Sequence, residues 1–90
     1  MVNRIVKQTK QEMIQILKEF SLENSDKENG WIFKFSFVDI YLGDNYIYIT
    51  PKTNSYNEIQ ISYESLCSVY VGFKEINFFT HFGKIVIYQE

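Results

Sequence analysis

The sequence is short of several residue types on which common protein chemistries depend. Its 90 residues include no alanine and only one cysteine, one histidine and one arginine. A single cysteine excludes a disulfide framework within the chain. Cys67 and His81 are separated by fourteen positions and have no further soft ligand beside them, so we expect no metal site. The four glycines are too scattered to form a phosphate-binding loop, and no cofactor is expected.

Long apolar runs are also missing. The longest are four residues, at 46–49 and 85–88, whereas a membrane-spanning helix needs about 20. Near the N-terminus, Lys10, Glu12 and Lys18 interrupt any apolar core of a secretory signal. A lone cysteine is typical of a reducing compartment. We therefore expect a cytoplasmic protein without a membrane partner.

The most abundant residue types indicate the base composition of the coding genome. Phe, Ile, Lys, Asn and Tyr number 8, 12, 8, 7 and 7, together 42 of 90. These residues have AT-rich codons, while the absent alanine has GC-rich ones. The composition therefore indicates an AT-rich genome. A low-GC bacterium, or a phage or other mobile element living in one, is our hypothesis, and any other AT-rich organism fits equally well.

Size and charge describe one small globular domain covering 1–90. Hydrophobic residues make up 46% of the chain and charged residues 22%, a balance that allows a buried core and argues against disorder. The formal net charge is -2. An acidic chain with one arginine is poorly suited to bind nucleic acid, because phosphate contacts dominate that affinity.

An amphipathic helix is predicted at about 3–22. On a helical wheel the apolar side chains cluster on one side, with Ile14 as the one misfit. Thr9 and Glu12 have the spacing of a capping box, so the helix begins either near Asn3 or near Lys10. We expect its apolar stripe to pack on the protein's own sheet. The stripe comprises Val2, Ile5, Val6, Thr9, Met13, Ile16, Leu17 and Phe20.

The polar stretch 23–30 is predicted to be a loop. It ends in Asn29 and Gly30, a pair suited to positive φ.

Alternating apolar residues predict strands in the remainder, 31–90. In 31–42 the apolar positions change parity once, which a β-bulge would produce. Gly43, Asp44 and Asn45 predict a tight turn, and a strand follows at 46–50 until Pro51 stops it. Further strands are expected at 58–63, at 75–82 and at 84–89, the last two forming a hairpin around Gly83. The segment 65–71 fits a strand or a helix, and we favour the strand.

The predicted fold is therefore α+β. An N-terminal amphipathic helix packs on a curved antiparallel sheet, or plugs a half-open barrel, of five to six short strands. Because one small core cannot hold all the aromatic residues, some should lie on the outer face of the sheet.

The sequence contains no strong candidate for a catalytic site. Cys67 and His81 could meet across strands and form a nucleophile–base pair, but no third orienting group is evident. The scattered carboxylates fit solvated strand and turn positions better than acid–base work. We therefore expect no enzyme, and a small enzyme using Cys67 and His81 is the third choice.

A nucleic-acid-binding sheet is the second choice. The stretch 71–78 partly resembles a signature strand of RNA-recognition motifs, matching it at Gly72, Phe73, Ile76 and Phe78. Val71 replaces the usual basic residue, and Lys74 and Glu75 replace the small and aromatic pair, so one stacking ring is missing.

A protein-binding module that inhibits or regulates a partner protein is the first choice. Tyr46 and Tyr48 should point to the outer face of one strand and Ile47 and Ile49 to the core, since strand side chains alternate. Tyrosine is common among binding hot spots. The predicted partner-binding residues are Tyr46, Tyr48, Asp44, Glu58 and Glu75, with the carboxylates facing a basic partner. Anti-CRISPR or other anti-defence inhibitors are one instance, and a homo-oligomer is an open alternative.

Overall fold

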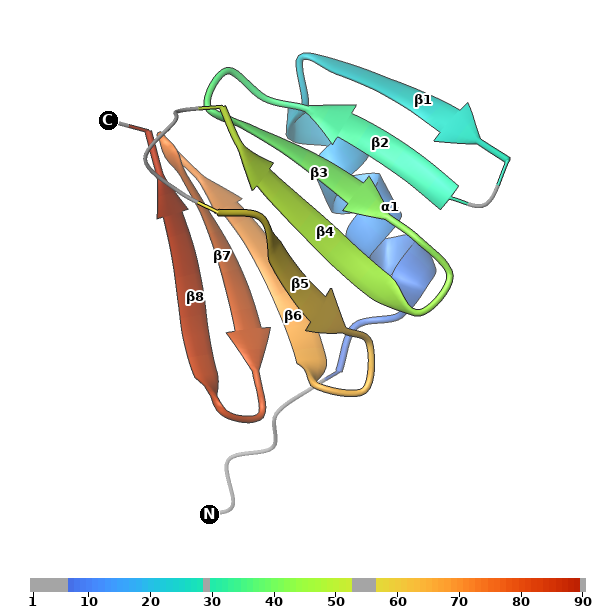
Figure 1. Cartoon of the computed structure of the whole chain (residues 1–90), viewed down its shortest axis with the longest axis vertical. Coiled ribbons are helices and arrows are strands. Elements are labelled where there is room, and N and C mark those ends of the chain that lie inside the picture. Colours follow the sequence, from blue (N-terminus) through green and yellow to red (C-terminus); the bar gives the residue numbers. More distant parts are fainter. Residues whose placement is uncertain (1–6, 29, 53–56, 90) are drawn as a thin grey trace.

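The protein has one helix and eight strands in its computed structural model, which describes residues 7–28, 30–52 and 57–89 (Figure 1). This confirms the α+β class, although the expected count of five to six strands is too low. The elements in chain order are α1 (Lys10–Phe20), β1 (Glu23–Lys27), β2 (Gly30–Lys34), β3 (Val38–Leu42), β4 (Tyr46–Pro51), β5 (Ile59–Ser62), β6 (Leu66–Gly72), β7 (Glu75–Thr80) and β8 (Gly83–Tyr88).

The strands form two antiparallel sheets. The first has the order β1-β2-β3-β4-β5 and the second the order β6-β7-β8, so strands that are consecutive in sequence pair with each other within each sheet. The helix α1 lies behind the five-stranded sheet in Figure 1 and contacts both β2 and β6. Over the described residues the sheets do not close into a barrel.

The helix begins at the capping box. Thr9 Oγ1 accepts a hydrogen bond from the Glu12 backbone N–H at 3.1 Å, and Glu12 Oε1 accepts one from the Thr9 N–H at 3.0 Å. Hydrogen bonding to the Glu12 carboxyl, first from the Thr9 backbone N–H and then from the Thr9 side chain, lowers the pKa of that carboxyl. The two bonds of the capping box satisfy N–H groups that the first helical turn cannot pair. Of the two predicted starts, the one near Lys10 is therefore confirmed.

The buried face of α1 differs from the predicted stripe. Met13 and Leu17 are buried as expected, but Ile14, the apparent misfit, is only 7% exposed, and Phe20 is 53% exposed. Because α1 contacts elements of both sheets, its buried arc is turned toward Ile14 and away from Phe20. Of the other stripe residues, Ile16 is half-buried and Thr9 is exposed, while Val2, Ile5 and Val6 lie outside the described residues.

The predicted loop at 23–30 is wrong, because most of it is strand β1. Its backbone pairs with β2 along its whole length, from Glu23 opposite Lys34 to Lys27 opposite Gly30. β1 is an edge strand whose side chains are mostly exposed, so its stability comes from backbone hydrogen bonds and needs no apolar alternation. The predicted positive φ at the Asn29–Gly30 pair involves Asn29, which lies outside the described residues. Glycine is needed at position 30 because a Cβ would collide with the Leu42 carbonyl oxygen.

The predicted bulge in 31–42 is also wrong, because this segment is a hairpin of two strands. The chain turns at Phe35–Val38, where the Phe35 N–H donates to the Val38 carbonyl oxygen at 2.9 Å. Phe33 lies directly opposite Ile40, and both are fully buried. The parity changes because both strands keep their apolar residues on the same inner face while the chain reverses.

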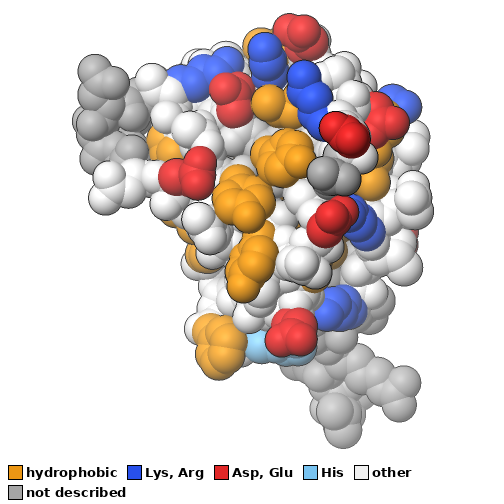
Figure 2. Space-filling view, turned by 45° about the vertical axis from the view of Figure 1, so that its right-hand side comes forward, with side chains coloured by type: hydrophobic (Ala, Val, Ile, Leu, Met, Phe, Trp, Pro, Cys, Tyr) orange, Lys and Arg blue, Asp and Glu red, His pale blue; other side chains and the backbone are white. Residues whose placement is uncertain are grey.

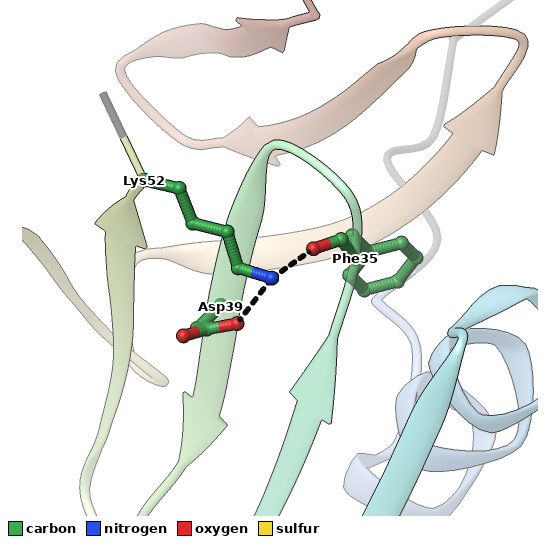
Figure 3. Close-up of polar contacts among 3 residues, drawn as sticks. All are labelled: Phe35, Asp39 and Lys52. Carbon is green, nitrogen blue, oxygen red and sulfur yellow. Dashed lines mark hydrogen bonds and ion pairs between the residues drawn. The ribbon is translucent and has the colours of Figure 1, made fainter.

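Lys52 links this turn to the end of β4 (Figure 3). Its ammonium donates to the Phe35 carbonyl oxygen at 2.6 Å and lies 3.4 Å from Asp39 Oδ1. Its backbone N–H donates to the Phe37 carbonyl oxygen at 3.1 Å. Asp39 Oδ1 has no hydrogen-bond partner among the described residues, so the nearby ammonium is the charge that offsets its burial.

The other strand predictions are confirmed. β4, β5, β7 and β8 lie where alternation places them, and 65–71 is strand, as β6. One core joins the helix to both sheets. Its buried members are Met13, Ile14, Leu17, Phe33, Phe35, Val38, Ile40, Leu42, Ile47, Ile49, Ile61, Leu66, Val69, Ile76 and Phe78.

Within the described residues, no helix is long and apolar enough to cross a membrane.

Candidate interaction surface

Three tyrosines form a row on the outer face of the five-stranded sheet, the face opposite α1. Tyr41 in β3 lies directly across from Tyr48 in β4, with ring centroids 5.9 Å apart. Tyr46 stands two positions away on the same strand, with its ring 6.3 Å from that of Tyr48. Tyr46 is 44% exposed, while Tyr41 and Tyr48 are half-buried. Figure 2 shows hydrophobic side chains in a line across one face of the protein, with acidic side chains on either side of it.

The predicted orientation of β4 is confirmed. Tyr46 and Tyr48 point outward, whereas Ile47 and Ile49 are fully buried under the sheet. The sequence prediction missed Tyr41. Its signal was available, because Tyr41 stands between Ile40 and Leu42, and alternation places it on the face opposite these two residues. Only the register of β3 with β4 reveals that it belongs to the same row.

Gly43 lets the tyrosine rings lie against the turn between β3 and β4. A Cβ at this position would stand 3.3 Å from Tyr41 Cε1 and 3.4 Å from Tyr48 Cε2. The Gly43 N–H donates to the Tyr46 carbonyl oxygen at 2.9 Å and closes the turn. The predicted turn at 43–45 is therefore confirmed, and it supports one end of the tyrosine row.

Two side chains anchor the same turn through the Gly43 carbonyl oxygen. It accepts hydrogen bonds from the Tyr63 hydroxyl at 3.1 Å and from Lys10 Nζ at 3.0 Å. Burial raises the pKa of Tyr63 to about 12, and the nearby charge of Asp44 contributes to the increase. The phenol is therefore neutral at ordinary pH and keeps the proton that it donates to the turn.

The structure brings two of the three predicted carboxylates to the tyrosine row. Asp44 is exposed in the turn beside Tyr46, and both line a shallow hollow of 340 Å³ that also includes Glu64. Glu58 lies near the other end of β4, where its carboxylate accepts a hydrogen bond from the Thr50 hydroxyl at 3.1 Å. The outer face thus has negative charge at both ends of the row.

Glu75 does not join this surface. It begins β7 in the three-stranded sheet, where it lies across from Gly72 in β6 and Tyr88 in β8. Sequence spacing could not separate Glu75 from the other carboxylates, because membership of a sheet depends on pairing between distant segments.

A second apolar surface, which we call the helix-end groove, was not predicted. It lies between the end of α1 and the β6–β7 turn, and it forms a hollow of 670 Å³ that includes Phe20, Tyr70 and Phe73. Phe73 is 89% exposed at the turn. The exposed Leu22 and the carboxylate-bearing Glu75 line an adjoining hollow of 260 Å³.

The position of Phe73 also differs from the one that the resemblance to RNA-recognition motifs implies. The segment 71–78 spans the end of β6, a turn and the start of β7. Lys74 in this turn has a φ of 61°. Phe73 therefore stands at a turn rather than in the middle of a strand, where the signature would put a stacking ring.

Cys67 and His81 do meet, as the sequence allowed. Cys67 Sγ lies 3.7 Å from His81 Nδ1, with Cys67 fully buried and His81 exposed. Cys67 Sγ also lies 3.8 Å from His81 Nε2 and 3.9 Å from the Ser65 carbonyl oxygen. No group of three or more metal-binding side chains occurs within the described part of the chain.

Comparison with known proteins gives no relative: no family model, no curated protein and no solved structure matches the chain. Function has to be argued from the surfaces themselves.

Proposed function

We propose that this protein is a small protein-binding module that inhibits or regulates a partner protein, and that it binds through the tyrosine row. The observation that carries the proposal is the alignment of Tyr41, Tyr48 and Tyr46 on the sheet face that lies opposite the helix. Tyrosine offers a large apolar ring with a polar tip at a low entropic cost, which makes it frequent among binding hot spots.

The surroundings of the row suggest the chemistry of the partner. Asp44 stands at one end of the row and Glu58 toward the other. Negative charge at both ends of an aromatic row favours a partner surface that carries lysine or arginine at its rim. An anti-defence inhibitor encoded by a phage or another mobile element, acting on a basic nucleic-acid enzyme, is one instance of such a module.

Affinity capture followed by a binding measurement tests the proposal. The protein is used to capture partners from the organism that encodes it, and the partner is then purified and titrated by calorimetry. The double variant Tyr46→Ala with Tyr48→Ala should weaken binding by about 30-fold or more, which corresponds to the hot-spot range of about 2 kcal/mol.

The double variant Tyr70→Ala with Phe73→Ala is the matched control. It also removes two exposed rings, but from the helix-end groove. Unchanged affinity in this control supports the tyrosine row. If the control loses binding while the tyrosine variant keeps it, the helix-end groove is the binding surface and the proposal is wrong.

Salt dependence separates this proposal from the nucleic-acid alternative. Aromatic rings on an open sheet can also stack on unpaired bases. Binding to a mixed-sequence single-stranded oligonucleotide that falls steeply with added salt would favour that alternative. We expect no measurable binding to the oligonucleotide.

A further inference from the structure

The edges of the two sheets point to a second interaction surface. An edge strand presents unpaired N–H and C=O groups that can pair with another chain, and natural proteins protect such edges with charges, short strands or a covering segment. The five-stranded sheet ends in β1 and β5, and the three-stranded sheet ends in β6 and β8.

Three of these edges are protected. β1 carries exposed charges at Glu23, Asp26 and Lys27, and β5 is only four residues long. β6 is covered by Gln8, whose backbone N–H donates to the Cys67 carbonyl oxygen at 2.7 Å. The side-chain oxygen of Gln8 also accepts from the Val69 N–H at 3.0 Å.

β8 is the least protected of the four edges. Lys84, near its start, is its one charge, and an unbroken apolar stretch follows that ends in the 65% exposed Tyr88. Within the described ranges, its backbone pairs with β7 and with no other strand. Figure 1 shows β8 at the outer side of the molecule, beyond β7.

The hydrogen-bond pattern tells which groups face outward. The Gln89 N–H donates to the Lys74 carbonyl oxygen at 2.9 Å, on the β7 side. In an antiparallel pair these directions alternate from residue to residue. Ile85 and Ile87 therefore direct their backbone groups to β7, and Lys84, Val86 and Tyr88 direct theirs to the open edge.

We infer that β8 is a dimerisation edge, at which two copies of this chain pair their β8 strands antiparallel about a twofold axis at Val86. This register pairs residues 84–88 of the two copies through about six backbone hydrogen bonds. It joins the two three-stranded sheets into one six-stranded sheet. A twofold axis makes such an interface self-complementary, as in most homodimers.

The side chains of β8 complement those of a second β8 in this register. With Val86 on the axis, Lys84 of one copy lies across from Tyr88 of the other, where the ammonium can rest on the ring. A register centred on Lys84 would place two like charges opposite each other, which is destabilising.

The core also continues to this edge. Ile85 and Ile87 pack against the buried cluster but remain half-buried. In the proposed pair, Ile85 of one copy lies across from Ile87 of the other on the inner face. Pairing would therefore remove further apolar surface from water, which adds to the backbone hydrogen bonds.

Analytical ultracentrifugation of the full chain tests the inference. We expect a monomer–dimer equilibrium with a dissociation constant of about 100 µM or tighter. Val86→Pro should abolish the dimer, because it removes an N–H that faces the open edge and none that pairs with β7. Val86→Lys should also give a monomer, because it places two ammonium groups together at the axis.

Val86→Thr is the matched control, since it keeps the branched shape and the N–H, and it should remain dimeric. Circular dichroism checks the folding of each variant, and Val86→Lys decides if Val86→Pro fails to fold. A wild-type chain that is monomeric at about 1 mM overturns the inference. So does a dimer that persists in Val86→Lys.

Disulfide cross-linking between copies tests the proposed register of the two β8 strands. In a Cys67→Ser background, Val86→Cys should form a disulfide between copies on mild oxidation, because paired residues at the axis lie within disulfide reach. Tyr88→Cys should not, because residue 88 lies across from residue 84. Cross-linking of Tyr88→Cys alone would mean that the strands pair differently from the register inferred here.

Discussion

Truncating Ile47 should destabilise the protein more than removing both Tyr46 and Tyr48, its neighbours on β4. Ile47 is fully buried and lies between Leu42 of β3 and Ile61 of β5, which are also buried. Ile47→Ala removes about three carbons, or about 2.4 kcal/mol of transfer free energy. The cavity left in a core held by two neighbouring strands raises the expected loss to about 3–4 kcal/mol.

The tyrosine pair should cost less because its rings are already partly in water. The double alanine variant removes the packing of the Tyr48 ring against the rings of Tyr41 and Tyr46. Aromatic pairs contribute about 0.5–1.5 kcal/mol each beyond area burial. The two lost pairs predict a destabilisation of about 1–3 kcal/mol, below the loss expected for Ile47→Ala.

Urea unfolding followed by Trp31 fluorescence measures both losses. Trp31 is half-buried and stacks on Phe33, with ring centroids 5.9 Å apart, so the emission of Trp31 should change on unfolding. With a slope of about 1 kcal/mol per M, Ile47→Ala should lower the midpoint by about 3 M. The milder Ile47→Val should lose about 1 kcal/mol. If the tyrosine variant proves less stable than Ile47→Ala, the assignment of the inner and outer faces of β4 is refuted.

Three further predictions concern the helix, Tyr63 and Cys67. Leu17→Ala should cost about 2–5 kcal/mol in urea melts, while Phe20→Ala should cost under about 1 kcal/mol because that ring is half exposed; equal costs would contradict the orientation of α1. The pKa of Tyr63 is raised from 10.0 to about 12, so its contribution to stability is complete below pH 10 and is lost as the pH rises toward 12. Allowing for solvent screening, that loss should be at most about 2 kcal/mol, and Tyr63→Phe should remove this part of the alkaline dependence in thermal melts. Cys67 should react slowly with a thiol reagent in the folded protein and quickly after denaturation, since it is fully buried; fast labelling of the native thiol would revive the cysteine-enzyme hypothesis.

Much of the candidate surface could be anticipated from local pattern, but its extent could not. Alternation along β4 predicts correctly that Tyr46 and Tyr48 share a face opposite Ile47. It contains no information on which strand lies beside β4. Tyr41 joins the row, and Glu75 leaves it, because of pairing between segments that the alternation of a single strand does not encode.

The helix shows the same difference between features set by local sequence and features set by tertiary contacts. The capping box predicts a start at Lys10 from residues three positions apart, and this is confirmed because the bonds involved are local. Which arc of the helix is buried depends on where β2 and β6 meet it. That contact buries Ile14 and exposes Phe20, against the centre of the apolar stripe.

By itself, the sequence determined the α+β class, the capping box that marks one of two possible helix starts, and the faces of the alternating strands. These follow from side-chain periodicity and from hydrogen bonds between near neighbours. Only the tertiary structure decided that 23–27 is a strand and that 31–42 is a hairpin. Strand β1 is held by backbone groups that every residue possesses, so its polar side chains give no sign of it. A bulge and a tight hairpin change the parity of a strand in the same way, and only the position of the partner strand distinguishes them.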